Sequence, residues 1–160
     1  MKYHEFLRIT RLLNKQFACT PLLYGSVGLE QRLGTVLDTD DIDILIPNPL
    51  VTAWLDLLVS TMETLGYAVC DEKEHTFHNG SFHVAFARIE SLSTFAAVDI
   101  SQIPMIVDNG AFYLLLDLRA YLSVYRASSK DGYRKNIKHK QDAEKIKLIT
   151  SVLIDNRSNR

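Results

Sequence analysis

One six-residue segment, Asp41-Ile42-Asp43-Ile44-Leu45-Ile46, constrains the fold more than any other part of the chain. Side chains alternate between the two faces of a β-strand, so the pattern predicts a strand with Asp41 and Asp43 on one face and the isoleucines on the other. The isoleucine face belongs in a core, whereas two neighbouring carboxylates repel each other unless a cation lies between them. Oxygen ligands of this kind suit Mg²⁺, which is normally held by one or two carboxylates together with substrate phosphates. The segment therefore predicts a metal site next to a phosphate site.

A phosphate site is predicted fifteen residues earlier, at Gly25-Ser26, which follows a short apolar segment and precedes a helical spacing of apolar residues over 27–33. Glycine lets the backbone approach a phosphate closely, and the free amides at a helix N-terminus attract anions. A third carboxylate, Asp99, lies in a strand-like segment over 95–100. We expect this strand to lie beside the strand of residues 41–46, so that the three acids meet opposite the Gly25-Ser26 turn.

Gly25-Ser26, Asp41, Asp43 and Asp99, in that order, resemble the nucleotidyltransferase superfamily of DNA polymerase β. The segment from Gly25 to Gly34 and the short loop to residues 40–43 resemble most the lincosamide and aminoglycoside nucleotidyltransferases and the abortive-infection toxin nucleotidyltransferases. The resemblance implies that Gly25 and Ser26 contact the triphosphate of an NTP, with ATP as the expected nucleotide. It also implies that the three aspartates hold two Mg²⁺ or Mn²⁺ ions, which activate the acceptor hydroxyl and neutralise the leaving pyrophosphate.

Near the C-terminus, the segment 134–142 resembles the Lys-x-x-x-Asp helix of the antibiotic-modifying and toxin relatives. Lys138 and Asp142 are four residues apart and meet on one helix face. The resemblance implies that Lys138, together with Lys140 or Arg134, neutralises the triphosphate, while Asp142 anchors the helix or orients Lys138. A surface ion pair between Lys138 and Asp142 is the alternative interpretation.

The order of apolar patterns predicts an α+β fold, in which a mixed, partly antiparallel sheet packs against helices. We expect a nucleotidyltransferase-like core over residues 1–108 and a C-terminal helical extension over 109–160. The predicted helices are 2–17, 27–33, 49–65 and two more between 111 and 153. The predicted strands are 22–25, 41–46, 67–69, 76–78, 82–87 and 95–100, with a tight hairpin turn at Asn79-Gly80.

The composition, 47% hydrophobic and 23% charged over 160 residues, is that of an ordinary globular protein. No apolar run approaches the length of a membrane span, and the charged start lacks the apolar part of a signal peptide. We therefore expect a cytoplasmic protein with no membrane partner, in which Cys19 and Cys70 are reduced thiols. Residues 1–125 contain 8 Lys/Arg and 15 Asp/Glu, whereas residues 126–160 contain 10 and 4. The basic end favours contact with phosphates or nucleic acid.

These features predict a metal-dependent nucleotidyltransferase that transfers a nucleoside monophosphate from an NTP to an acceptor and releases pyrophosphate. The acceptor stays open between a small molecule, tRNA and a protein, and a homodimer is also left open. Two other function classes compete: a catalytically silent member of the fold that binds a nucleotide or a partner, and a nucleic-acid-binding module that uses the basic C-terminal helix.

Three histidines and four tyrosines are expected to have structural roles and not to form a metal site or a base-stacking surface. His75, His78 and His83 are expected to be satisfied or exposed strand histidines, because they have no cysteine partner and no closed set of four ligands. Four tyrosines are expected to pack in the core and on helix faces rather than stack on nucleic-acid bases. They are Tyr113, Tyr121, Tyr125 and Tyr133.

Overall fold

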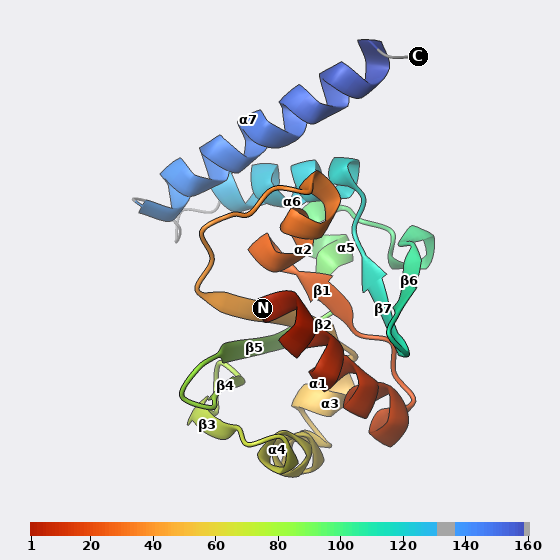
Figure 1. The fold of residues 1–160 in the computed structure, drawn as a ribbon, viewed down its shortest axis with the longest axis vertical. Coiled ribbons are helices and arrows are strands. Elements are labelled where there is room, and N and C mark those ends of the chain that lie inside the picture. The colour runs from red at the N-terminus through yellow and green to blue at the C-terminus, as the bar shows by residue number, and fades with distance from the viewer. Residues whose placement is uncertain (131–136, 159–160) are drawn as a thin grey trace.

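The structure, a computed structural model, describes residues 1–130 and 137–158 (Figure 1). Its helices are α1 (Lys2–Phe17), α2 (Gly25–Leu33), α3 (Asn48–Val51), α4 (Leu55–Thr64), α5 (Ser91–Ala96), α6 (Leu118–Lys130) and α7 (Ile137–Ser158), with a 3₁₀ turn at Ile100–Gln102. The strands are β1 (Leu22–Tyr24), β2 (Asp41–Ile46), β3 (Ala68–Asp71), β4 (Thr76–His78), β5 (His83–Arg88), β6 (Met105–Asp108) and β7 (Ala111–Leu115). They form one seven-stranded sheet in the order β3-β4-β5-β2-β1-β7-β6. The predicted α+β class is confirmed.

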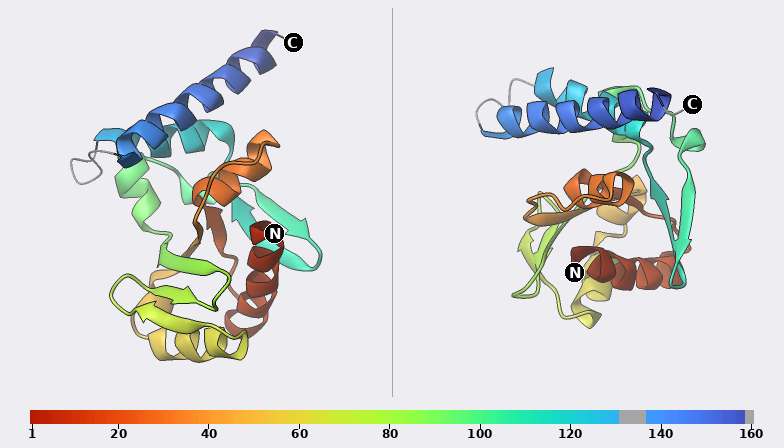
Figure 2. Two further views of the ribbon diagram at one scale, coloured as in Figure 1. Left: turned by 60° about the vertical axis from the view of Figure 1, so that its left-hand side comes forward. Right: turned by 45° about the horizontal axis from the view of Figure 1, so that its top comes forward.

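The sheet is mixed, and its central strand is β2, which carries Asp41 and Asp43. β2 pairs antiparallel with β1 and parallel with β5, while β1 pairs parallel with β7. Helix α1 packs against β7, and α2 packs against β1 and β2. Figure 2 shows α1 on one side of the sheet and α2, α6 and α7 on the other. Helix α7 lies across α6, and its C-terminal half extends beyond it (Figures 1 and 2).

The predicted alternation of β2 is confirmed, since Ile42, Ile44 and Ile46 are fully buried while Asp41 is exposed and Asp43 half-buried. Burying three isoleucine side chains contributes several kcal/mol of hydrophobic free energy, about 1.5–3 kcal/mol for each side chain. This contribution fixes the register, because a slip of one residue would turn the aspartates into the core. The carboxylates therefore face away from the core as a consequence of the isoleucines.

The predicted strand over 95–100 is wrong. Residues up to Ala96 form α5, Ala97 ends that helix in the left-handed conformation with φ 54°, and Asp99 caps the following 3₁₀ turn. Burial of Leu92, Ala96 and Val98 accounts for the apolar pattern without a strand. β5 takes the expected place beside β2.

The sheet also continues beyond residue 108, where helices alone were expected. β6 and β7 form an antiparallel hairpin in which Asp108 pairs with Ala111, joined by Asn109-Gly110, both with positive φ. A boundary between 108 and 109 would divide this hairpin. The long helix predicted over 49–65 is divided into α3 and α4 at Thr52, whose hydroxyl donates to the Asn48 carbonyl (2.9 Å).

Cys19 and Cys70 are free thiols, and burial raises the pKa of Cys19 to about 11. Within the described ranges, no helix combines the length and the apolar character that a membrane crossing needs.

Candidate functional site

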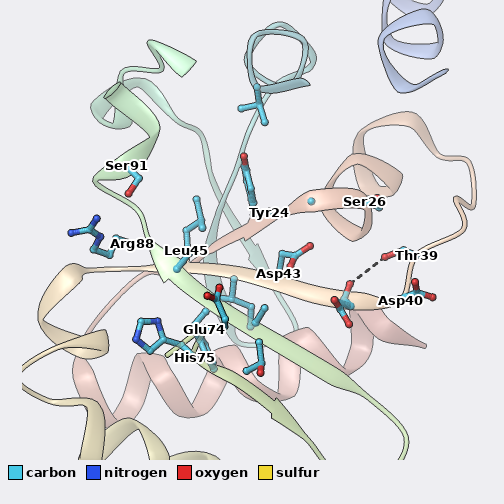
Figure 3. A pocket seen from close by; sticks show the side chains of 18 of the residues that line it. Tyr24, Ser26, Thr39, Asp40, Asp43, Leu45, Glu74, His75, Arg88 and Ser91 are labelled. Atoms are coloured by element: carbon cyan, nitrogen blue, oxygen red, sulfur yellow. Dashed lines mark hydrogen bonds between the residues drawn. The ribbon is translucent and has the colours of Figure 1, made fainter. Parts of the chain in front are cut away.

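A cavity of about 640 Å³ opens over the face of β2 that carries the aspartates. β2 and β5 form its floor, and the N-terminus of α2 lies on one side. Figure 3 shows Asp43 between this helix end, marked by Ser26, and the β3–β4 loop with Glu74 and His75. Residues of α6 and α7 complete the wall above the sheet. The cavity therefore gathers side chains from both ends of the chain.

The two aspartates of β2 both line this cavity. Asp43 has Tyr24 as its neighbour on β1 and Ala85 as its neighbour on β5. The loop before β2 is held in place because the Thr39 hydroxyl donates to the Asp41 carbonyl (3.2 Å) and the Lys2 ammonium donates to the Thr39 carbonyl. The structure thus brings Asp41 and Asp43 together with Gly25 and Ser26, as the sequence predicted.

Gly25 meets two requirements of this arrangement. Its φ is +65°, a conformation that side chains with a Cβ rarely adopt. A Cβ at this position would also overlap Oδ2 of Asp43. Glycine therefore allows the first turn of α2 and the Asp43 carboxylate to approach closely, which places the helix N-terminus and its amides beside the acid. Anions are stabilised at such a helix end.

The strand next to β2 supplies no carboxylate at the matching positions. In the parallel register, Ala85 lies beside Asp43 and Ala87 lies beside Leu45, and both alanines line the cavity. Among the residues that the structure describes, no group of three or more His, Cys, Asp or Glu side chains could hold a metal ion. Two carboxylates on one strand fit one Mg²⁺ whose remaining ligands are phosphate oxygens and water.

Asp99 lies away from this cavity. Its Oδ1 accepts hydrogen bonds from the Ser101 amide (3.0 Å) and the Ser101 hydroxyl (2.7 Å). It lines a separate, smaller cavity of about 210 Å³ together with Arg119 of α6. The expectation that Asp99 would lie beside Asp41 and Asp43 is therefore wrong, because it rested on a strand that does not form.

The C-terminal helices contribute different residues from those predicted. Tyr125 of α6 and Gln141 and Lys145 of α7 line the cavity, and the Lys145 ammonium lies 5.0 Å from the centre of the Tyr125 ring. Lys140 is exposed and does not line it. The side chain of Lys138 lies outside the described part of the chain.

Asp142 is fully buried between α6 and α7, where its Oδ2 accepts a hydrogen bond from the Ser128 hydroxyl (2.8 Å). The predicted anchoring of this helix by Asp142 is thus supported by a contact with α6. A helix repeats every 3.6 residues, so Gln141 and Lys145 share one face. Neither residue was predicted, because this spacing alone does not show which face of the helix meets the cavity.

The β3–β4 loop adds Lys73, Glu74 and His75 to the cavity, and none of them was predicted to take part. His75 has φ 53°, and its carbonyl accepts a hydrogen bond from the Phe86 amide of β5 (3.0 Å). His78 and His83, in contrast, are exposed and stack on each other with ring centres 5.9 Å apart. The structural interpretation of these two is confirmed.

Three of the four tyrosines expected in the core, Tyr113, Tyr121 and Tyr125, are buried. Tyr133 lies outside the described residues, as does Arg134. Acidic side chains outnumber basic ones around the cavity. The acids are Asp38, Asp40, Asp41, Asp43 and Glu74, and the bases are Lys73, Arg88 and Lys145.

A comparison with curated proteins found a relative of similar length. The uncharacterized protein YnaI of Bacillus subtilis (strain 168) is 37% identical over 151 residues, which cover 94% of this chain and 97% of YnaI. No family model matches the sequence.

Among solved structures, the solution structure of the antibiotic-resistance factor ANT(2'')-Ia matches with a TM-score of 0.52 at 18% identity. That match covers 99% of this chain and 96% of the other. The crystal structure of ANT(2'')-Ia in complex with adenylyl-2''-tobramycin matches with a TM-score of 0.57 at 16% identity, over 96% and 90% of the two chains. At these identities the likeness concerns the fold, and the fold is nucleotidyltransferase-like.

Proposed function

Because this chain belongs to the same family as the uncharacterized protein YnaI and has a nucleotidyltransferase-like fold, we propose that it binds a nucleoside triphosphate in the cavity over β2. We further propose that it transfers the nucleoside monophosphate group to an acceptor and releases pyrophosphate. One observation carries the proposal: Asp41 and Asp43 face the cavity beside the N-terminus of α2, with Gly25 making room for the Asp43 carboxylate.

In this proposal Asp41 and Asp43 hold Mg²⁺ or Mn²⁺. The ion would neutralise charge on the phosphates and on the leaving pyrophosphate. The amides at the start of α2 and the Ser26 hydroxyl donate to phosphate oxygens, and Lys145 of α7 supplies a positive charge to the same cavity. Positioning and charge neutralisation of this kind are most of what phosphoryl transfer requires from a protein. Asp99 has no role in the proposed reaction, because it lines a different cavity.

ATP is the proposed nucleotide and a cationic small molecule the proposed acceptor. The fold neighbour was crystallised with adenylyl-2''-tobramycin, a compound in which an adenylyl group is joined to tobramycin. Asp38, Asp40 and Glu74 line the cavity in addition to the two acids of β2. These extra negative charges attract a cation and repel the backbone of tRNA. We expect a hydroxyl-bearing cation to bind on their side of the cavity.

A second function is favoured by one specific observation. Ala85 and Ala87 occupy the β5 positions beside β2, so the acids there come from one strand only. Two-metal catalysis of an in-line displacement needs ligands for both ions. A protein that binds the nucleotide with one ion and transfers nothing is therefore the competing proposal. Incubation with ATP labelled at the α-phosphate and a pool of small cationic acceptors separates the two, since only the transferase moves the label.

The binding site itself is tested by ATP titration with Mg²⁺ and with EDTA. We expect wild-type protein to bind ATP at least about tenfold more tightly with Mg²⁺, the scale of a contact to a charged group, and Asp43→Asn to lose this difference while remaining folded. At ATP concentrations a hundred times Kd, binding stabilises the native state by about 2.7 kcal/mol, so the shift in Tm gives a second readout.

Asp56→Asn is the matched control, because Asp56 lies in the first turn of α4, is exposed and does not line the cavity. We expect it to retain the Mg²⁺ dependence. A folded Asp43→Asn variant with the Mg²⁺ dependence of the wild type would overturn the site.

A further inference from the structure

Two tyrosines on successive turns of α6 differ in the hydrogen bonding of their hydroxyl groups. Tyr121 and Tyr125 stack with ring centres 6.1 Å apart and planes inclined by 16°, and they are 0% and 5% exposed. The Tyr121 hydroxyl donates to the Leu23 carbonyl of β1 (3.2 Å). The Tyr125 hydroxyl, also buried, has no hydrogen-bond partner among the residues that the structure describes.

Burial of an unpartnered hydroxyl costs free energy, so its retention needs a reason. Gly28 shows how the partner of Tyr121 is secured, because a Cβ there would overlap the Tyr121 hydroxyl and displace it from Leu23. No comparable arrangement serves Tyr125. Burial raises the pKa of Tyr125, and the nearby Ser26 side chain acts in the opposite direction. The geometry of the two hydroxyls is nevertheless not that of a hydrogen bond.

Tyr125 lies among groups that can bind an anion, although the carboxylates of Asp43 and Asp142 are also near enough to raise the pKa of its hydroxyl. Tyr125 lines the main cavity together with Ser26, near the start of α2, and with Lys145, whose ammonium lies 5.0 Å from the ring centre. Burial raises the pKa of the hydroxyl well above neutrality, so it carries its proton at pH 7. A protonated hydroxyl beside a helix N-terminus and a lysine is a hydrogen-bond donor placed for an oxyanion.

We propose that the Tyr125 hydroxyl donates a hydrogen bond to a phosphate oxygen of the nucleotide bound in the cavity. This inference rests on the proposed nucleotide site and adds one binding residue from the helical wall. Tyr125 then completes its hydrogen bonding only in the complex, whereas Tyr121 completes it within the protein. The two residues are therefore expected to respond oppositely to the same substitution.

The experiment compares Tyr125→Phe with Tyr121→Phe in the full chain. Affinity is measured by calorimetry with ATP and with inorganic tripolyphosphate, both with Mg²⁺, and stability by urea unfolding without ligand. We expect Tyr125→Phe to weaken both ligands by about tenfold, the loss expected for one hydrogen bond to a charged group, with an unchanged or higher urea midpoint. Tyr121→Phe should lower the midpoint and leave both affinities within about twofold of wild type, because its hydroxyl bonds the protein and not the ligand.

Several results would overturn the inference. Wild-type affinity in Tyr125→Phe would do so while leaving the nucleotide site intact. A loss for ATP but not for tripolyphosphate would assign the hydroxyl to the nucleoside instead of the phosphates. A fall in the ligand-free urea midpoint as large as that of Tyr121→Phe would show that the hydroxyl has a partner within the protein. Failure of the wild type to bind either ligand would reject the proposed site together with this contact.

Discussion

β2 and β5 are adjacent, parallel and in register, yet they present opposite chemistry to the same cavity. β2 presents Asp41 and Asp43, and β5 presents Ala85 and Ala87. The backbone of a sheet offers equivalent positions on both strands, so the difference lies in the side chains alone. The acidic part of the floor is therefore one strand wide, and the methyl groups of β5 leave space beside it. One metal ion and a ligand fit this arrangement better than two metal ions do.

The largest effect is expected from Gly25→Ala, because a Cβ at this position would fill the space that the Asp43 carboxylate occupies beside α2. The new Cβ meets Oδ2 of Asp43, so the carboxylate must move away from the helix N-terminus. We expect the affinity for ATP with Mg²⁺ to fall by about tenfold or more and the free energy of unfolding to fall by about 1 kcal/mol or more. Calorimetry and urea unfolding give the two values.

Gly34→Ala is the matched control for Gly25→Ala. Gly34 has nearly the same φ, +68°, but nothing lies within 4 Å of the position of its Cβ. It should share the loss of stability that comes from the backbone and keep ATP affinity within about twofold of wild type. Equal loss of affinity in both variants would show that backbone strain, and not the contact with Asp43, controls the site.

An intermediate effect is expected from Ala85→Asp, which gives β5 the chemistry of β2. Beside Asp43, a third carboxylate should raise the number of Mn²⁺ ions bound with ATP from one to two, measured by the electron paramagnetic resonance of free Mn²⁺. Without metal, the added charge should lower the free energy of unfolding by about 0.5 kcal/mol, because like charges on neighbouring strands repel.

Ala85→Asn introduces a side chain of nearly the same shape as Asp but without the charge. It should neither add a second Mn²⁺ ion nor lower the free energy of unfolding by charge repulsion. Two ions bound already by the wild type would contradict the comparison of the strands, since the second ion would then be held by groups other than residues of β5.

The smallest effect is expected from Asp99→Ala. The substitution removes a cap on the 3₁₀ turn at Ile100–Gln102, which should cost about 0.5–1 kcal/mol of stability. ATP affinity and any transfer of label should stay within about twofold of wild type, because Asp99 lines a separate cavity. A loss of transfer of about a hundredfold, the scale of a catalytic acid or base, with binding kept, would show that Asp99 acts in the reaction.

The parts of the fold that were predictable are those where a local pattern and its burial agree. β2 alternates in sequence and in burial, and Asn79-Gly80 marks the β4–β5 turn. The same dipeptide at Asn109-Gly110 marks the β6–β7 turn, so the sequence carries the same local signal for this hairpin. The segment 95–100 had no such signal, because a short apolar run fits a buried helix end as well as a strand.

The site was predictable to the extent that it lies on one strand and one turn. Gly25, Ser26, Asp41 and Asp43 meet because β1 and β2 are paired neighbours. Tyr125 and Lys145 reach the cavity only through the packing of α6 on α2 and of α7 on α6, which no local pattern specifies. Whether a third acid lies beside Asp43 depends on which segment pairs with β2. Tertiary contacts, which the local sequence does not show, pair β2 with β5 and not with residues 95–100.

The parallel pairing of β1 with β7 sets an order in which the molecule can assemble during synthesis. Leu22 pairs with Leu114, so this part of the sheet waits for more than ninety residues to emerge, whereas β2 has both its partners once β5 has been made. Because long-range pairing is slow, we expect the amides of β2 and β5 to be protected before those of β7 in pulsed hydrogen exchange. Asp41 and Asp43 would then be exposed to water and metal ions before α6 and α7 pack above them.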